Sequence, residues 1–326
     1  MDTIKNIDKN IKISLLKTML EIRRFEEEAI QLYYRNKLYG HLHPYLGEEA
    51  IAAGACMTLN KEDYILSTHR GHGHCIARGG DMNKMMAELF GRETGYCRGR
   101  GGSMHIADPE LGILGANGIV GGGLPISVGS GISSKIKNKN NVTICFFGDG
   151  AANNGVFHES LNMAAVLKLP VIYICENNLF AVSTNVLKST SVKRIADRSI
   201  SYDIPGYSIN GNDPIEVYMT VKKAVEYAKK GLGPSLVEAR TYRFTGHHLN
   251  DAETYRDKDE TRYFREKNDP VINYKEKLLN EKLITAEELK EMEKVVSEKI
   301  KNAVVFAENS PEPSPDEFLE EIRRQN

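Results

Sequence analysis

Two short polar clusters carry residue types that bind a cation and an anion. Gly148-Asp149-Gly150 begins the first cluster, and Asn178 ends the second. Asp149 offers a carboxylate and Asn178 an amide oxygen, which are hard donors of the kind that Mg²⁺ takes together with substrate phosphates. The glycines allow a close turn, and a helix that follows them would point its backbone N–H groups at an anion. The pair therefore predicts a magnesium ion with a bound diphosphate.

A second candidate cluster is the run from His69 to Cys75, which holds three histidines, Arg70 and a cysteine. It admits three interpretations: a zinc site, an anion-binding loop, or a solvated turn. No second cluster has the spacing of a structural zinc site. The fixed charge of Arg70 and the flanking glycines favour an anion-binding loop. Long glycine-rich loops at 91–105 and 115–123 also predict tight backbone geometry around a ligand.

Regular elements must bring these clusters together. Apolar runs at 142–147 and 171–175 flank a helical pattern at 156–167, which predicts a βαβ unit with two parallel strands. Both polar clusters then lie at the carboxyl ends of strands, where open α/β sheets bind ligands. We expect an α/β fold with a doubly wound, mostly parallel sheet. Further strands are expected at 64–68, 207–210 and 235–243, and helices at 13–34, 50–57, 85–90, from Pro125, at 215–230 and from Thr285.

The chain is expected to form one domain over residues 1–326, with a helical arm at 1–35 and a helical extension at 270–326. The helix that Pro125 opens is rich in glycine, so it should be buried. Residues 249–270 are highly charged and are expected to form a mobile loop. Thr285 to Glu288 reads as a capping box at a helix start.

Composition excludes several classes of function. The net charge is −1, so nothing favours nucleic acid as a partner. No run is long and apolar enough for a membrane span, and the N-terminus has no apolar signal core. The five cysteines form no CxxC pair. We therefore expect reduced thiols and a cytoplasmic location.

Taken together, these stretches resemble a known family. Gly148-Asp-Gly150 followed by Asn177-Asn178 resembles the thiamine-diphosphate motif. Over residues 12–320 the chain is similar to α subunits of the thiamine-dependent first component of 2-oxoacid and acetoin dehydrogenase complexes. The stretches that carry the likeness are 69–75, 101–108, 115–121 and 246–247. The resemblance implies a sheet of the thiamine-diphosphate-binding type.

The resemblance also implies a metal and cofactor site. In such subunits the equivalents of Asp149, Asn178 and the backbone carbonyl of Phe180 bind Mg²⁺. The remaining cofactor-binding residues that it implies are Gly150 and Ala151 at the diphosphate, Arg70 and Arg243 at its charge, His69 where family members often have Tyr, and Gly118 and Val120 at the aminopyrimidine.

Three histidines match active-site positions of the family, namely His43, His72 and His247. His247 would also contact the cofactor and shuttle protons. The cofactor would supply the cleavage chemistry, and the product would pass to a lipoyl group on a partner acyltransferase. The resemblance further implies a β subunit that supplies the activating glutamate, in an assembly of two α and two β chains.

The substrate stays open between two small molecules. The runs 69–75, 101–108 and 251–256 look most like those of acetoin-type subunits, whereas many bacterial pyruvate-type subunits share the earlier motifs. Pyruvate-type chains usually have Ser where this chain has His248. A non-catalytic nucleotide-binding α/β domain and a zinc hydrolase are the alternatives from other classes.

Overall fold

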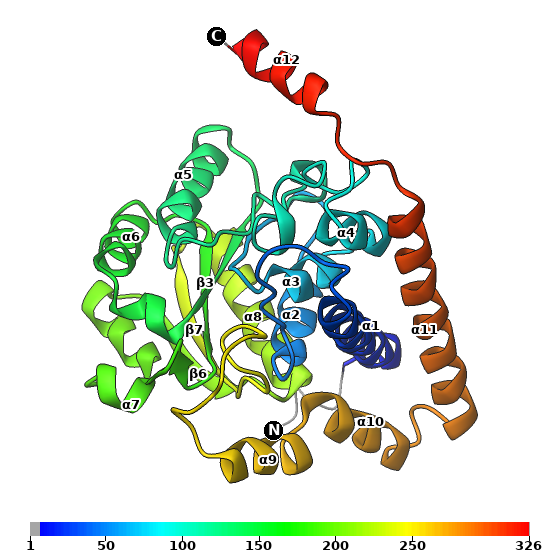
Figure 1. Ribbon diagram of the computed structural model, residues 1–326. Coiled ribbons are helices and arrows are strands. Elements are labelled where there is room, and N and C mark those ends of the chain that lie inside the picture. Colours follow the sequence, from blue (N-terminus) through cyan, green and yellow to red (C-terminus); the bar gives the residue numbers. More distant parts are fainter. Residues whose placement is uncertain (1–6, 326) are drawn as a thin grey trace.

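The central element is a five-stranded sheet in which every neighbouring pair of strands is parallel (Figure 1). The structure is a computed structural model and describes residues 7–325. The strand order is β1-β2-β3-β7-β6, formed by Tyr64–Leu66, Thr143–Gly148, Val171–Asn177, Ser235–Arg240 and Gly206–Asn210. The predicted parallel α/β sheet is thus confirmed. So is the βαβ unit, in which α6 (Gly155–Val166) connects β2 to β3.

Helices cover both faces of this sheet, as a doubly wound fold requires (Figure 1). Successive residues of a strand point to opposite faces. Cys145 and Phe147 pack with α6 and with α5 (Gly123–Ile136), whereas Ile144 and Phe146 belong to the larger core on the other face. That larger core includes side chains from α1 (Lys9–Tyr34), α2 (Glu49–Cys56), α3 (Gly71–Ala77), α4 (Met82–Leu89), α8 (Pro214–Lys229) and α11 (Ala286–Asn309).

Helical segments extend the sheet domain at both ends. In the N-terminal arm, α1 begins after Asp8, whose side chain accepts a hydrogen bond from the Asn10 N–H; residues 1–6 lie outside the described part. At the other end, α10 (Pro270–Asn280) leads to α11, and Thr285 and Glu288 form the predicted capping box. The last helix, α12 (Pro315–Gln325), lies at one end of the molecule, where Glu321 pairs with Arg98 and Arg100 (Figure 1).

Three expectations about local structure are wrong. The run 69–75 is not an extended loop, because α3 begins at Gly71. Its glycines serve packing instead, since a Cβ at Gly73 would overlap the Tyr45 ring. Residues 249–270 contain α9 (Lys258–Lys267), which Asp257 caps and whose Phe264 ring stacks on Tyr242. Only one face of α5 is buried, because Ile126 is 48% exposed and Ile136 75% exposed.

All five cysteines are free, and Cys145 and Cys175 are buried in strands. Among the helices of residues 7–325, none combines the length and the apolar character that a bilayer crossing demands.

Candidate active site

A cavity of about 220 Å³ lies at the carboxyl ends of the strands. In the register of the sheet, Gly148 of β2 is opposite Glu176 of β3, so the residues that follow these two strands emerge side by side. Asp149 and Asn178 therefore both line the cavity, and Arg70 after β1 and Arg243 after β7 join them. The parallel topology brings four separate segments of the sequence to one site.

Most of the residues predicted for the site line this cavity. Those that do are His69, Arg70, Val120, Asp149, Gly150, Ala151, Asn178, Phe180, Arg243 and His247. Three predicted residues do not, namely His43, His72 and Gly118. His43 lies behind the lining, whereas Gly118 lies beside His105, whose Nε2 would be 3.4 Å from a Cβ at that glycine.

Asp149 has the properties of a cation ligand. The residue is 2% exposed, and its Oδ2 atom has no hydrogen-bond partner within the protein. Burial raises the pKa of Asp149 to about 6, against the opposing effects of its own backbone N–H and of Arg243. A buried carboxylate oxygen without a partner is costly. A cation in the cavity would satisfy it, so this residue fits the predicted magnesium site.

The other two predicted metal ligands have partners of their own. Asn178 donates from Nδ2 to Oε1 of Glu48 at 3.1 Å, and its Oδ1 accepts from the Phe180 N–H at 3.4 Å. The Phe180 carbonyl accepts a hydrogen bond from Arg243 Nη1 at 3.1 Å. A carbonyl oxygen has two lone pairs, so this contact leaves one for a cation.

Two buried arginines give the cavity positive charge. Arg70 donates from Nη1 to the Pro44 carbonyl at 2.9 Å and from Nη2 to the His247 carbonyl at 2.8 Å. Burial and the nearby Arg243 lower the pKa of Arg70 to about 10, which keeps the guanidinium charged at neutral pH. Gly150 fits closely against the rest of the site, because a Cβ there would lie 2.6 Å from that of Ala181. Charge and close backbone approach suit a diphosphate.

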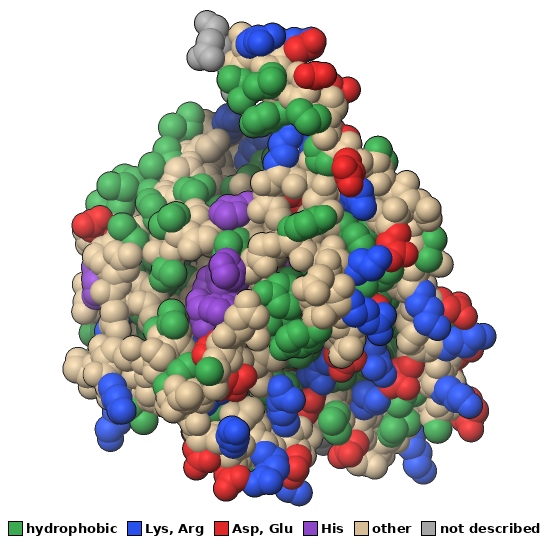
Figure 2. Space-filling model, viewed as in Figure 1, with side chains coloured by type: hydrophobic (Ala, Val, Ile, Leu, Met, Phe, Trp, Pro, Cys, Tyr) green, Lys and Arg blue, Asp and Glu red, His purple; other side chains and the backbone are tan. Residues whose placement is uncertain are grey.

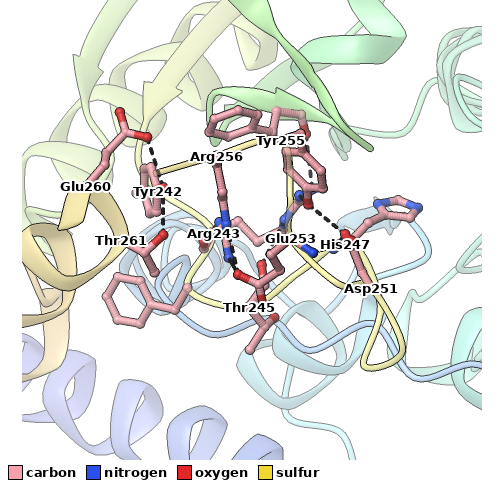
Figure 3. A network of polar contacts seen from close by, with 12 residues as sticks. Tyr242, Arg243, Thr245, His247, Asp251, Glu253, Tyr255, Arg256, Glu260 and Thr261 are labelled. Atoms are coloured by element: carbon pink, nitrogen blue, oxygen red, sulfur yellow. Dashed lines mark hydrogen bonds and ion pairs between the residues drawn. The ribbon is translucent and has the colours of Figure 1, made fainter. Parts of the chain in front are cut away.

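The segment after β7 is held by a polar network centred on Asp251 (Figure 3). Oδ2 of this residue accepts hydrogen bonds from the Tyr255 hydroxyl at 2.6 Å and from the His247 N–H at 2.6 Å. Burial opposes ionisation, but these hydrogen bonds and that of the Glu253 N–H outweigh it and lower the pKa of Asp251 to about 2. Tyr255 also accepts from Arg243 Nη2 at 2.7 Å. The network thereby fixes Arg243 and His247, the two residues of this segment that line the cavity.

Five histidines gather around one end of the cavity, namely His41, His43, His69, His247 and His248. Figure 2 shows a group of histidine side chains near the middle of the face in view. The ring centroids of His43 and His69 are 4.9 Å apart, those of His43 and His247 5.0 Å, and those of His69 and His247 5.2 Å. His41 and His248 contact each other, and His248 also contacts His43 and His247. Burial and the charge of Arg70 lower the pKa of His43 to about 3, that of His69 to about 2 and that of His247 to about 4. The three inner imidazoles are therefore neutral at pH 7.

His72 and His74 have structural partners. His72 is fully buried, with Nδ1 3.0 Å from Glu26 Oε1 and Nε2 3.0 Å from Ser103 Oγ. His74 contacts Ser67 and Glu176. The three histidines of residues 69–75 thus contact different side chains. Within residues 7–325 no three His, Cys, Asp or Glu side chains are grouped to hold a metal ion, which removes the support for a zinc site.

The sequence interpretation missed two acids that line the cavity, Glu48 and Glu176. Glu176 accepts hydrogen bonds from the Tyr45 hydroxyl and lies 3.0 Å from His74 Nε2. Two signals could have pointed to them. Glu48 is one of two adjacent acids where a helix of small residues begins, and Glu176 directly precedes the Asn pair at the end of an apolar strand.

Comparisons with known proteins identify the class. Residues 17–316 match the model of the family described as "Dehydrogenase E1 component", and the chain belongs to that family. Its members are oxidoreductases, and membership implies thiamine diphosphate as the cofactor. This family takes the place of the two alternatives from other classes, the nucleotide-binding domain and the zinc hydrolase.

The relatives are named for two substrates. The chain is 49% identical over 304 residues to the α subunit of acetoin:2,6-dichlorophenolindophenol oxidoreductase of Bacillus subtilis, covering 93% of this chain and 91% of that one. It is 41% identical to the subunit of the same name from Cupriavidus necator, over 97% of this chain and 95% of the other. The α subunit of the pyruvate dehydrogenase E1 component of Rhizobium meliloti is 39% identical, over 98% and 92%. Because all three are α subunits, a β subunit partner is implied.

Proposed function

We propose that this chain is the α subunit of a thiamine-diphosphate-dependent acetoin dehydrogenase. It would cleave acetoin and pass the two-carbon unit to a lipoyl-bearing acyltransferase. The observation that carries the proposal is the unpartnered Asp149 oxygen in a cavity that Asn178, Arg70 and Arg243 also line, in a chain of the E1 component family. The cofactor, when bound, supplies an electron sink for the bond that breaks.

The predicted metal and cofactor residues have proposed binding roles. Asp149, the Asn178 side chain and the Phe180 carbonyl would hold Mg²⁺, in keeping with its preference for oxygen ligands. The other proposed contacts are the backbone of Gly150 and Ala151 to the diphosphate, Arg70 and Arg243 to its charge, and Gly118 and Val120 to the aminopyrimidine. Gly118 itself is outside the cavity lining, whereas its neighbours Asn117 and Ile119 line the cavity.

The inner histidines would handle protons and orient the substrate. Their lowered pKa values leave neutral rings that can accept a proton at one nitrogen and donate at the other. His247 would serve as the proton shuttle, with Asp251 and Arg70 fixing its backbone. His43 would support it from behind. For His72 the contacts favour a structural role over the catalytic one that the resemblance implies.

We further propose two α and two β chains per assembly, with the activating glutamate supplied by β. The acidic side chains that line the cavity within residues 7–325 are Asp149, Glu48 and Glu176. Glu48 binds the proposed Mg²⁺ ligand Asn178, and Glu176 is engaged by Tyr45 and His74, so we assign neither acid to the aminopyrimidine. Free cysteines throughout support a cytoplasmic location.

Acetoin is proposed over pyruvate on the higher identity to an acetoin-type relative, 49% against 39%. The neutral histidines are consistent with an uncharged hydroxyketone. The experiment is to reconstitute the chain with its β partner and to compare acetoin-dependent dye reduction with pyruvate decarboxylation. A larger kcat/KM for pyruvate would transfer the proposal to pyruvate dehydrogenase.

The cofactor site has a separate test. Asp149→Ala removes the unpartnered carboxylate and should abolish Mg²⁺-dependent binding of thiamine diphosphate, measured by calorimetry on the assembled protein. Affinity equal to that of the unaltered chain would refute the metal assignment.

A further inference from the structure

Glu48 is a buried acid with no role so far. It immediately precedes α2 and is 0% exposed, yet its side chain makes no capping hydrogen bond to that helix. The adjacent Glu49 is also buried, but its contacts explain it. Glu49 pairs with Arg23 at 2.6 Å and accepts the Gly47 N–H at 3.0 Å. Of the two acids, only Glu48 lines the cavity.

The contact that Glu48 makes is directional. Its Oε1 accepts from Nδ2 of Asn178 at 3.1 Å, and its Oε2 has no partner within the protein. An amide has a donor end and an acceptor end, and only its oxygen can accept the Phe180 N–H. The NH₂ end of Asn178 therefore faces Glu48. The amide oxygen is then turned the other way, toward the turn that carries Phe180, whose N–H lies 3.4 Å from it.

We propose that Glu48 is a positioning residue that holds the Asn178 amide with its oxygen directed at the magnesium site. This inference rests on the proposed function, because Asn178 is a ligand only if that site binds the ion. Residues that orient metal ligands through hydrogen bonds typically contribute about 10- to 100-fold to metal affinity. The role does not depend on the charge of Glu48, since the carbonyl oxygen of a protonated acid accepts the same hydrogen bond.

A pair of variants tests the proposal in the full chain assembled with its β partner. Glu48→Met keeps the length of the side chain but removes the acceptor, whereas Glu48→Gln keeps an acceptor oxygen. Mn²⁺ serves as the probe, and its free concentration is followed by electron paramagnetic resonance in the presence of thiamine diphosphate. Glu48→Met should weaken Mn²⁺ binding about 10- to 100-fold, and Glu48→Gln should remain within about threefold of the unaltered protein.

A second readout separates positioning from general damage. At saturating Mn²⁺, the affinity of Glu48→Met for thiamine diphosphate should stay close to that of the unaltered protein, because the arginines that hold the diphosphate are intact. If Glu48→Met gives no cooperative melting transition, Glu48→Ala is the replacement variant.

Three outcomes would overturn the inference. They are unaltered Mn²⁺ affinity in Glu48→Met, a Glu48→Gln variant as weak as Glu48→Met, or equal losses of Mn²⁺ and cofactor affinity. Failure of the proposed function looks different. In that case the unaltered protein itself would bind no Mn²⁺ with thiamine diphosphate, and Asp149→Ala would change nothing.

Discussion

His43, His69 and His247 contact one another at one end of the cavity, and burial beside Arg70 keeps their rings neutral. Neutral rings avoid the repulsion that three buried cations would suffer next to an arginine. The same arrangement ties the stability of the fold to pH, because an unfolded histidine takes up a proton at about pH 6.5.

The expected pH dependence follows from the sign of these shifts. Between pH 6.5 and about 4 these histidines bind protons in the unfolded chain but stay neutral in the folded chain. Their contribution to the free energy of unfolding therefore falls as the pH falls. The raised pKa of Asp149 acts in the opposite direction below pH 6. Urea denaturation of the unaltered chain and of a His43→Gln/His69→Gln variant, at pH 7 and pH 5, isolates the histidine part. The variant should lose less stability than the unaltered chain on acidification, and an equal or greater loss would contradict the prediction.

Removing the imidazole of His247 should separate binding from turnover. His247→Ala should leave the affinity for thiamine diphosphate nearly intact, because the proposed diphosphate and metal contacts come from other residues. It should lower the rate of acyl transfer by about 10²- to 10⁴-fold, the usual contribution of a proton-transferring group. Calorimetry and a lipoyl-acceptor assay measure the two quantities. His158→Ala, an exposed histidine on α6 outside the cavity lining, is the matched control and should change neither. If His247→Ala lowered the affinity for thiamine diphosphate as much as the rate of acyl transfer, His247 would be assigned to cofactor binding and not to proton transfer.

A site residue can be predicted from the sequence when local pattern and sheet topology place it, but not when the packing of distant segments does. Asp149 and Asn178 follow adjacent parallel strands, so local pattern and topology suffice to bring them together. Glu48 lies in the cavity only because α2 packs where it does. Its local sequence indicates burial but does not say at which site. His72 stands in a run of histidines, which suggests an active-site residue. In the structure it binds Glu26 and Ser103, which come from distant segments of the sequence.

At the scale of elements, the crossing of α2 and α8 depends on a glycine. A Cβ at Gly54 would lie 2.8 Å from Cβ of Val217 and 2.9 Å from the Pro214 carbonyl oxygen. Overpacking of this kind costs about 1–3 kcal/mol, and the better helix propensity of alanine returns up to about 1 kcal/mol. Gly54→Ala should therefore lower the free energy of unfolding by about 1–2 kcal/mol in urea denaturation.

Gly129 on α5 provides the matched control, because a Cβ there would meet no atom within 4 Å. Gly129→Ala should leave stability unchanged or raise it by about 0.5–1 kcal/mol. If both variants gained stability, the two helices would not be as closely packed as the structure has them.

The elements that were mispredicted share a physical cause. Strands and long helices were predicted because their apolar periodicity is local. Glycines in α3 and charges in α9 are typical of loops, but here glycine lets α3 pack against Tyr45, and stacking of Phe264 on Tyr242 holds α9. In both helices a long-range contact overrides the local preference. The exposed face of α5 was missed for a related reason, since low helix propensity indicates a need for packing but does not say on how many sides.

At the scale of the molecule, we propose that the whole chain is one domain. The larger core joins side chains of α1, α4, α8 and α11 with those of the sheet, so both helical extensions share it. The cavity has an open side in this chain. Ile119 and Val120 line it although they are 73% and 52% exposed. Apolar side chains left exposed at a ligand site are typical of an interface with another chain.

In our proposal, none of the acids that line this open site within residues 7–325 activates the cofactor. Asp149 and Glu48 are assigned to the proposed Mg²⁺ site, and Glu176 is engaged by Tyr45 and His74. On this chain alone, the acidic proton of bound thiamine diphosphate should exchange with D₂O about as slowly as in the free cofactor. Addition of the β partner should raise the exchange rate by at least about 10²-fold, the contribution expected of a positioned glutamate. Quenched-flow exchange followed by NMR measures the rate, and a β chain with its glutamate replaced by glutamine is the control. Fast exchange on the α chain alone would mean that one of its own acids activates the cofactor, and the proposed division of labour between the subunits would fail.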